Sequence, residues 1–306
     1  MTALAARLLF LLARLFAQLP WPWLLRVADV LAWLWLRLDA RESRVARVNL
    51  DLAYPELLPH ERIERHEAIL RTTAHQALET LRLWTRRPQR NLALIHETTG
   101  LALFDAALAS GRGVIVAAPH YGNWELLNQW LASRTSLAIL YRPPESAIGE
   151  AFLQRARAAF GDRVTQIRAE GSAIRQVYRR LGAGGVVGIL PDQQPKAGDG
   201  EFAPFFGVQA LTMTLLGRLA HRTGAVVLFA YCERLDTGRH GEPVFALRIE
   251  PAPAGIDDAD PKRAVAALNA AVEHIARRDP AQYQWTYKRY TLRPPGSGED
   301  NPYRQR

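Results

Sequence analysis

A histidine and a glutamate lie five residues apart in the stretch His120-Tyr-Gly-Asn-Trp-Glu125. Histidine is the side chain best matched to general-base work near neutral pH, and a carboxylate can fix its tautomer and stabilise the imidazolium. The pair therefore indicates removal of a proton from a group such as a hydroxyl. Taken alone this spacing has little specificity, because many proteins carry a histidine and a glutamate this far apart by chance.

The residues around His120 predict a strand, a tight turn and the start of a helix. The apolar run Val114 to Ala118 ends at a proline, and an apolar-periodic segment follows the turn at 124–133. Backbone amides at such a junction are expected to point outward, where they can bind an anion or an oxyanion. Gly122, which has no side chain, would let a substrate approach the backbone closely.

Polar side chains also follow two other apolar runs. Arg142 comes directly after the run 136–141, and Asp192 follows the run 185–190. If these runs are parallel strands, their carboxyl ends lie at the same sheet edge as His120. Arg142 could then clamp a phosphate, and Asp192 could orient Arg142 or a hydroxyl. Each is equally consistent with an ordinary turn residue, so it is their coincidence that favours a site.

Strand and helix patterns alternate along the rest of the chain. Strands are predicted also at 225–232 and 245–249, and helices at 61–83, 99–109, 124–133, 146–160, 171–182, 209–222 and 261–278. Such alternation favours an α/β domain with a mostly parallel central sheet flanked by helices. An aromatic group, Phe202, Phe205 and Phe206, either lines an acyl channel or a membrane-facing rim, or packs as core.

The N-terminal residues are strongly apolar. They include tryptophans at positions 21, 23, 33 and 35, but charges such as Arg7 and Arg14 interrupt every run before it reaches the roughly 18–20 residues of a spanning helix. Residues 1–45 are predicted to form a membrane-embedding helix or hairpin whose arginines extend to head groups. The alternative is a helix pair packed on the body as ordinary core. The run Arg41 to Arg47 would mark the membrane exit, with a turn from Asn49 to Pro55.

Composition limits the possible partners and cofactors. The net charge is +9, and only Lys196, Lys262 and Lys288 among the basic residues are lysines. An arginine-rich surface suits a phosphorylated ligand, an anionic lipid surface, an acidic protein or nucleic acid. The single cysteine, Cys232, lies in an apolar run and is predicted to be a buried packing thiol. No metal-binding set, nucleotide-binding glycine loop or serine-hydrolase motif is present, and nucleic-acid binding has no recognition module to support it.

Four parts of the chain resemble one protein family. His120 to Glu125 resembles the H-x4-D/E motif of the glycerolipid acyltransferase superfamily, in the form found in the bacterial late (lauroyl/myristoyl) acyltransferases of lipid A. The other matching blocks are Tyr141-Arg142-Pro143, then Pro191-Asp192-Gln193 with Pro204-Phe205-Phe206-Gly207, and finally Tyr283-Gln284-Trp285 with Lys288-Arg289-Tyr290. The resemblance covers nearly the whole chain.

This resemblance implies an O-acyltransferase. His120 would be the general base and Glu125 its supporting carboxylate, and the alkoxide formed would attack an acyl thioester on acyl carrier protein or coenzyme A. Arg142, Asp192, Gly122 and Asn123 would contact substrate, with no metal and no cofactor. The acceptor would be a lipid A precursor, or alternatively an ornithine-type aminolipid, a glycolipid or a pigment-linked lipid. A non-catalytic basic membrane-bound scaffold of the same fold is the alternative from another class.

The residue patterns indicate a division of the chain, and the resemblance implies a location. Residues 1–45 would be a membrane anchor, 46–292 the acyltransferase domain and 293–306 a loose C-terminal tail. The enzyme would work at the cytoplasmic face of the bacterial inner membrane, where acyl carrier protein and the lipid acceptor meet.

Overall fold

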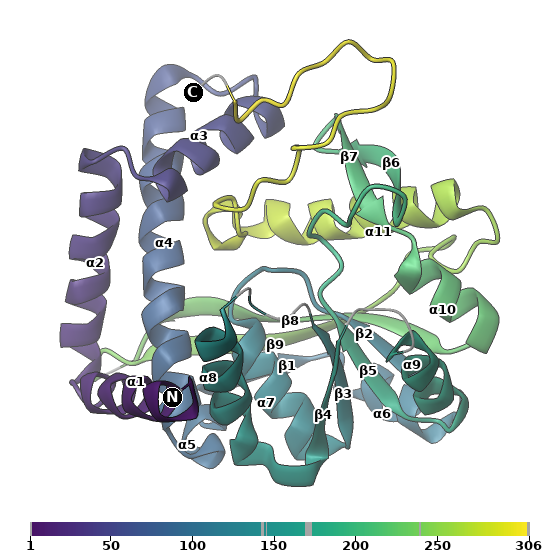
Figure 1. Cartoon of the computed structure of the whole chain (residues 1–306), viewed down its shortest axis with the longest axis horizontal. Helices are drawn as coiled ribbons and strands as arrows, with labels where there is room; N and C mark the ends of the chain where they lie inside the picture. The colour runs from purple at the N-terminus through teal and green to yellow at the C-terminus, as the bar shows by residue number, and fades with distance from the viewer. Residues whose placement is uncertain (1, 142–143, 145, 169–172, 239, 305–306) are drawn as a thin grey trace.

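The central sheet has seven strands in the order β1-β9-β8-β2-β5-β3-β4 (Figure 1). The computed structural model describes residues 2–141, 144, 146–168, 173–238 and 240–304. The strands are β1 (Ile95–Thr99), β2 (Val114–Ala117), β3 (Leu137–Tyr141), β4 (Val164–Arg168), β5 (Val186–Ile189), β8 (Val226–Thr237) and β9 (Pro243–Pro251). Strands β8, β2, β5, β3 and β4 are parallel, whereas β9 pairs antiparallel with β8 and parallel with β1. The predicted mostly parallel α/β sheet is confirmed.

Helices cover both faces of this sheet. On one face lie α6 (Leu101–Ala109) and α7 (Trp124–Arg134), and on the other lie α9 (Ala173–Gly182), α10 (Leu215–Thr223) and α11 (Pro261–Arg278). All four residues of β2 are buried. They alternate between the faces, because successive side chains of a strand point to opposite sides. This burial fixes the strand that leads into His120.

The N-terminal part is helical throughout its described length. It contains α1 (Thr2–Phe16), α2 (Trp21–Arg37), α3 (Arg41–Ala53), α4 (Pro59–Thr85) and α5 (Pro88–Leu92). Figure 1 shows α2 running alongside the long helix α4, with α1 near α8 (Ala147–Arg157). The predicted turn from Asn49 to Pro55 is wrong in its first part, because α3 continues to Ala53. Val45, Ala46, Val48, Leu50 and Ala53 are apolar at helical spacing and are buried.

Helices α1 and α2 each pack on one side and expose leucine, valine or tryptophan on the other. On α2, Leu24 and Ala28 are fully buried, whereas Trp23 and Trp33 are more than half exposed. In the described part of the chain, no single helix is long and apolar enough to cross a membrane. The pair Leu4–Phe16 and Trp21–Arg37, bent by 112°, passes that test only when taken together.

A hairpin interrupts the predicted helix 209–222. Strands β6 (Gly200–Phe205) and β7 (Val208–Met213) pair antiparallel, and α10 begins only at Leu215. The two turn residues, Phe206 and Gly207, both have positive φ, as a tight hairpin turn requires. Phe205 and Phe206 are buried beside Tyr283 and Trp285, so these two phenylalanines pack as core, whereas Phe202 is half-buried.

The C-terminal segment is anchored to the body at Arg293 and Tyr303, with residues 295–300 exposed between them, so it is not loose along its whole length as expected. Tyr303 is buried, and its hydroxyl donates to Oδ1 of Asn49 over 2.5 Å. Arg293 donates to the carbonyl of Gln209 and pairs with Glu299. The single cysteine, by contrast, behaves as predicted: Cys232 is fully buried, and burial raises the pKa of its thiol.

Candidate active site

His120 and Asp192 meet at the carboxyl ends of two adjacent parallel strands. Ala117 of β2 pairs with Ile189 of β5, and each polar residue lies three positions further along its own segment. Nδ1 of His120 is 2.8 Å from Oδ1 of Asp192, and the main-chain N–H of His120 donates to Oδ2 over 2.9 Å. One carboxylate therefore fixes both the ring and the backbone of the histidine, and the expectation that both lie at one sheet edge is confirmed.

The environment of Asp192 keeps its carboxyl group ionised. Burial by itself raises the pKa of this fully buried group, but the charge of His120 and its two hydrogen bonds outweigh burial and hold the pKa below the usual value. An ionised Asp192 requires a proton on Nδ1 of the imidazole. When the ring has lost its other proton, Nε2 is an acceptor, which is the state a general base needs.

Glu125 does not contact the imidazole in the way expected. It is buried in the first turn of α7, and its carboxylate pairs with the guanidinium of Arg157 at the end of α8. Arg157 in turn approaches the side-chain oxygen of Gln166 at 3.4 Å. The carboxylate that orients the ring is therefore Asp192, because the fold brings that side chain, and not the one in the same motif, against Nδ1.

The backbone amides after β2 are not free for an oxyanion, contrary to expectation. Within the described chain, the amides of four consecutive residues donate to acceptors of the protein itself. His120 donates to Asp192, Tyr121 to Pro119, Gly122 to Gln282 over 3.2 Å and Asn123 to Cys232 over 2.8 Å. A segment from the far C-terminus closes the loop further, since the amide of Gln284 donates to the carbonyl of His120 over 3.0 Å.

Gly122 and Asn123 make structural contacts, and Nδ2 of Asn123 is buried and has no hydrogen-bond partner within the described residues. Gly122 has φ +58°, and a Cβ there would lie 2.0 Å from the carbonyl oxygen of Cys232. The close approach of β8 therefore requires glycine at this position. Asn123 is buried and caps α7, accepting a hydrogen bond from the amide of Leu126 over 3.0 Å. Arg142, predicted to bind substrate, lies outside the described residues.

Two glutamines that the predicted site leaves out lie beside the histidine. Nε2 of Gln193 is 3.2 Å from Nε2 of His120 and donates to Oε1 of Gln284, also over 3.2 Å. Both glutamines belong to stretches that carry the family resemblance, which is the signal that could have identified them. Trp124 packs edge-on against the imidazole, with ring centroids 4.8 Å apart.

A buried ionic cluster anchors the other side of the loop. The hydroxyl of Tyr121 donates to Oε1 of Glu233 over 2.8 Å, and Arg278 binds both oxygens of the same carboxylate. Burial raises the pKa of Glu233, but its hydrogen bonds to Arg278 and Tyr121 outweigh burial and lower it overall. This bidentate ion pair holds Glu233 in place, and Glu233 in turn restricts the position of Tyr121, the residue next to His120.

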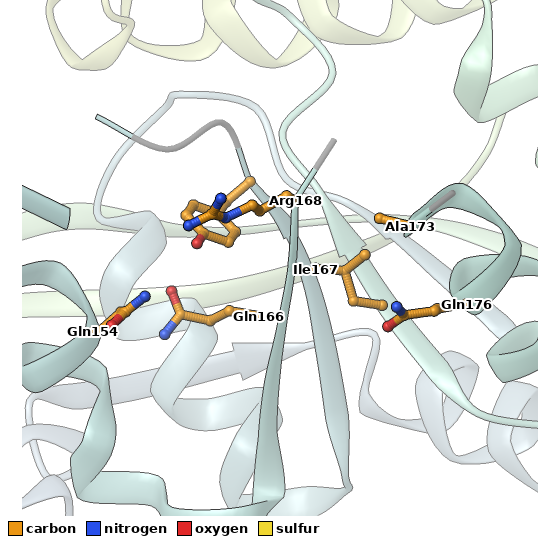
Figure 2. Close-up of a pocket in the computed structure, with 7 residues that line it drawn as sticks. Gln154, Gln166, Ile167, Arg168, Ala173 and Gln176 are labelled. Carbon is orange, nitrogen blue, oxygen red and sulfur yellow. The ribbon is translucent and has the colours of Figure 1, made fainter. Parts of the chain in front are cut away.

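A cavity of about 390 Å³ opens at the same sheet edge, near the ends of β3 and β4 (Figure 2). Its lining comprises Tyr141, Gln154, Gln166, Ile167, Arg168, Ala173 and Gln176. His120 and Asp192 are not among these residues; the connection runs through Gln166, which contacts Arg157, the partner of Glu125. Three amides, a phenol and an arginine suit a ligand rich in hydroxyl or phosphate groups.

Comparison with known proteins identifies the family. Residues 3–291 match the family described as "Bacterial lipid A biosynthesis acyltransferase". The chain is 27% identical over 283 residues to the lipid A biosynthesis lauroyltransferase of Escherichia coli (strain K12), covering 92% of this chain and 90% of that protein. It is also 27% identical over 293 residues to the lipid A biosynthesis palmitoleoyltransferase of the same strain, covering 92% and 89%. A shorter match, 29% over 136 residues, covers 44% of this chain and 42% of a phosphatidylinositol mannoside acyltransferase of Mycobacterium tuberculosis.

Proposed function

The chain belongs to the family of bacterial lipid A biosynthesis acyltransferases and is an acyltransferase, and on that premise we propose that it esterifies a hydroxyl of a lipid A precursor. The acyl group would come from a thioester on acyl carrier protein. The observation that carries the proposal is the hydrogen bond between Nδ1 of His120 and the ionised Asp192, which leaves Nε2 as a proton acceptor. The names of the relatives that match over most of their length support lipid A as the acceptor.

The reaction needs a base because a hydroxyl is a weak nucleophile at neutral pH. Nε2 of His120 would take the hydroxyl proton while the oxygen attacks the thioester carbon, and a positioned base contributes about 10²–10⁴-fold to the rate. Asp192 would hold the imidazolium formed in this step. The tetrahedral intermediate would then expel the thiolate, which takes the proton from His120. Glu125 would act through Arg157 rather than through the imidazole.

The donor and acceptor are supported by different features. The net charge of +9 favours an acidic donor such as acyl carrier protein. The polar cavity near the ends of β3 and β4 fits the sugar part of a glycolipid better than an apolar group. The identity is 27% to both the lauroyl- and the palmitoleoyltransferase, so the similarity does not favour one acyl chain length over the other.

The proposed reaction is tested by supplying the purified enzyme with a tetraacylated lipid A precursor and acyl carrier proteins that carry different chains. We expect one added acyl group by mass spectrometry, and a loss of about 10²–10⁴-fold for His120→Ala. Arg112→Ala, at an exposed arginine whose guanidinium donates to the carbonyl of Gly224, serves as the control and should retain activity. If the lipid A precursor stays unmodified and an ornithine-type aminolipid or a mannoside lipid is acylated, that lipid and not lipid A is the acceptor.

The exposed apolar face of α1 and α2 would hold the enzyme at the cytoplasmic face of the inner membrane. Leu8 is 59% and Leu12 is 55% exposed, one helical turn apart on α1. Arg26 and Arg37 of α2 lie over the rings of Trp23 and Trp33. Leucines, tryptophans and arginines in this arrangement are typical of helices that lie in a membrane interface.

Substitution of both leucines tests this location. Because burial of one leucine contributes about 1.5–3 kcal/mol, Leu8→Glu/Leu12→Glu should weaken binding to vesicles of phosphatidylethanolamine and phosphatidylglycerol by well over tenfold in a flotation assay. Leu103→Glu, at a leucine 41% exposed on α6, is the matched control and should float like the wild type. Equal flotation of all three proteins contradicts the proposed membrane-binding surface. If the wild type is a dimer and the double variant is a monomer, this face is instead an interface with a second copy of the chain.

A further inference from the structure

The carboxamide of Gln193 lies directly against the nitrogen that would act as the base. Its Nε2 is 3.2 Å from Nε2 of His120 and 3.2 Å from Oε1 of Gln284. Since Asp192 accepts the proton of Nδ1, Nε2 of the neutral ring is an acceptor, and each of the two amide protons of Gln193 has a partner. The reversed amide would place its oxygen beside Oε1 of Gln284 with no proton between them. Gln193 is therefore a donor toward the histidine.

This amide occupies the place that an acceptor hydroxyl must take. A base and the group it deprotonates lie about 2.6–3.2 Å apart between heavy atoms, and Nε2 of Gln193 is within that shell of His120. A hydroxyl that reaches the base must therefore displace the amide. Because Gln284 accepts a hydrogen bond from the same amide, this contact can keep the displaced N–H beside the imidazole.

The backbone amides that could stabilise an oxyanion at this loop are already used, whereas Nδ2 of Asn123 is buried and has no hydrogen-bond partner in the part of the chain that the structure describes. The amides of residues 120–123 all donate to acceptors of the protein. Among the described residues that contact the ring of His120, Asp192 accepts a hydrogen bond and Trp124 packs edge-on. Gln193 is the one of these contacts that supplies a donor.

We propose, on the basis of the acyl transfer proposed above, that Gln193 is a catalytic residue that fills the acceptor-hydroxyl position in the free enzyme and donates Nε2–H to the oxyanion during the reaction. The hydroxyl proton passes to Nε2 of His120 as the O–C bond forms. The π electrons of the thioester carbonyl become the oxyanion that Gln193 binds. On collapse the C–S bond breaks, and the thiolate takes the proton back from His120.

Steady-state kinetics of Gln193→Ala and Gln193→Glu test the proposal. Loss of one oxyanion donor costs about 10²–10³-fold in kcat, so both variants should lose this much. The losses in kcat and in kcat/KM for the thioester should be equal, since the hydrogen bond exists only in the transition state. Gln193→Glu keeps the length of the side chain and removes the donor, so a loss of kcat in this variant cannot be caused by lost packing.

Gln194→Ala is the matched control in the same turn. Oε1 of Gln194 accepts from the amide of Leu292 over 2.9 Å, so this variant should lower thermal stability and keep kcat near the wild-type value. Wild-type kcat in Gln193→Glu, or an equal loss of kcat in Gln194→Ala, overturns the proposal for Gln193. Failure of the wild-type enzyme itself to transfer an acyl group contradicts the proposed function instead, so the two failures are distinct.

Discussion

Replacing Asp192 with asparagine is expected to lower kcat by about 10⁴-fold, the effect of the same change in a serine-protease triad. The asparagine amide can present its NH₂ group to Nδ1 of His120, which would move the ring proton to Nε2. A protonated Nε2 cannot accept the hydroxyl proton. Since Asp192 is 4% exposed and asparagine has nearly the same shape, the fold should be preserved.

The experiment measures kcat together with the ring tautomer of His120 by nitrogen-15 NMR. We expect Nδ1–H in the wild type and Nε2–H in Asp192→Asn. Asp105→Asn makes the same change at an exposed carboxylate paired with Arg134 and should leave both readings unchanged. If Asp192→Asn keeps kcat within about tenfold of the wild type, Asp192 has no part in supporting the base.

The second large effect is expected at Asn49, which ties α3 to the C-terminal segment. Its Nδ2 donates to the carbonyls of Trp285 over 2.6 Å and Tyr287 over 2.8 Å, and its Oδ1 accepts from Tyr303. Asn49 is 1% exposed, so water cannot replace these partners. Asn49→Asp turns both donated hydrogen bonds into contacts between oxygens. Because each buried group left unsatisfied costs about 1–3 kcal/mol, we expect a loss of roughly 3 kcal/mol or more.

Denaturant unfolding followed by circular dichroism measures this loss. The control is Arg41→Ala on the same helix, where the exposed pair with Glu42 should change stability by less than about 0.5 kcal/mol. Activity provides a second reading, since Gln284, one residue before Trp285, binds the carbonyl of His120. An Asn49→Asp variant as stable as Arg41→Ala would show that this link contributes nothing to the fold.

Apolar runs in the sequence predict the inner strands of the sheet correctly, but they do not predict its edge strands or the β6–β7 hairpin. The runs that became β2, β3 and β5 are buried on both faces, and a buried parallel strand must be apolar throughout. The edge strands are more polar: β1, Ile-His-Glu-Thr-Thr, is largely exposed, and β4, Val-Thr-Gln-Ile-Arg, buries only Ile167, so no apolar run marks them. The hairpin of β6 and β7 was missed because its short apolar pattern continues into that of α10.

The amino-acid sequence alone determined that His120 and Asp192 each follow an apolar run typical of a buried strand and that the chain resembles an acyltransferase family. It could not determine which carboxylate orients the base. That depends on the pairing of β2 with β5, which joins residues 72 positions apart, while Glu125 turns with the first turn of α7 toward Arg157. The sequence predicted a free set of amides after His120. Only the tertiary structure shows them occupied, because the C-terminal segment and β8 approach that loop from distant parts of the chain.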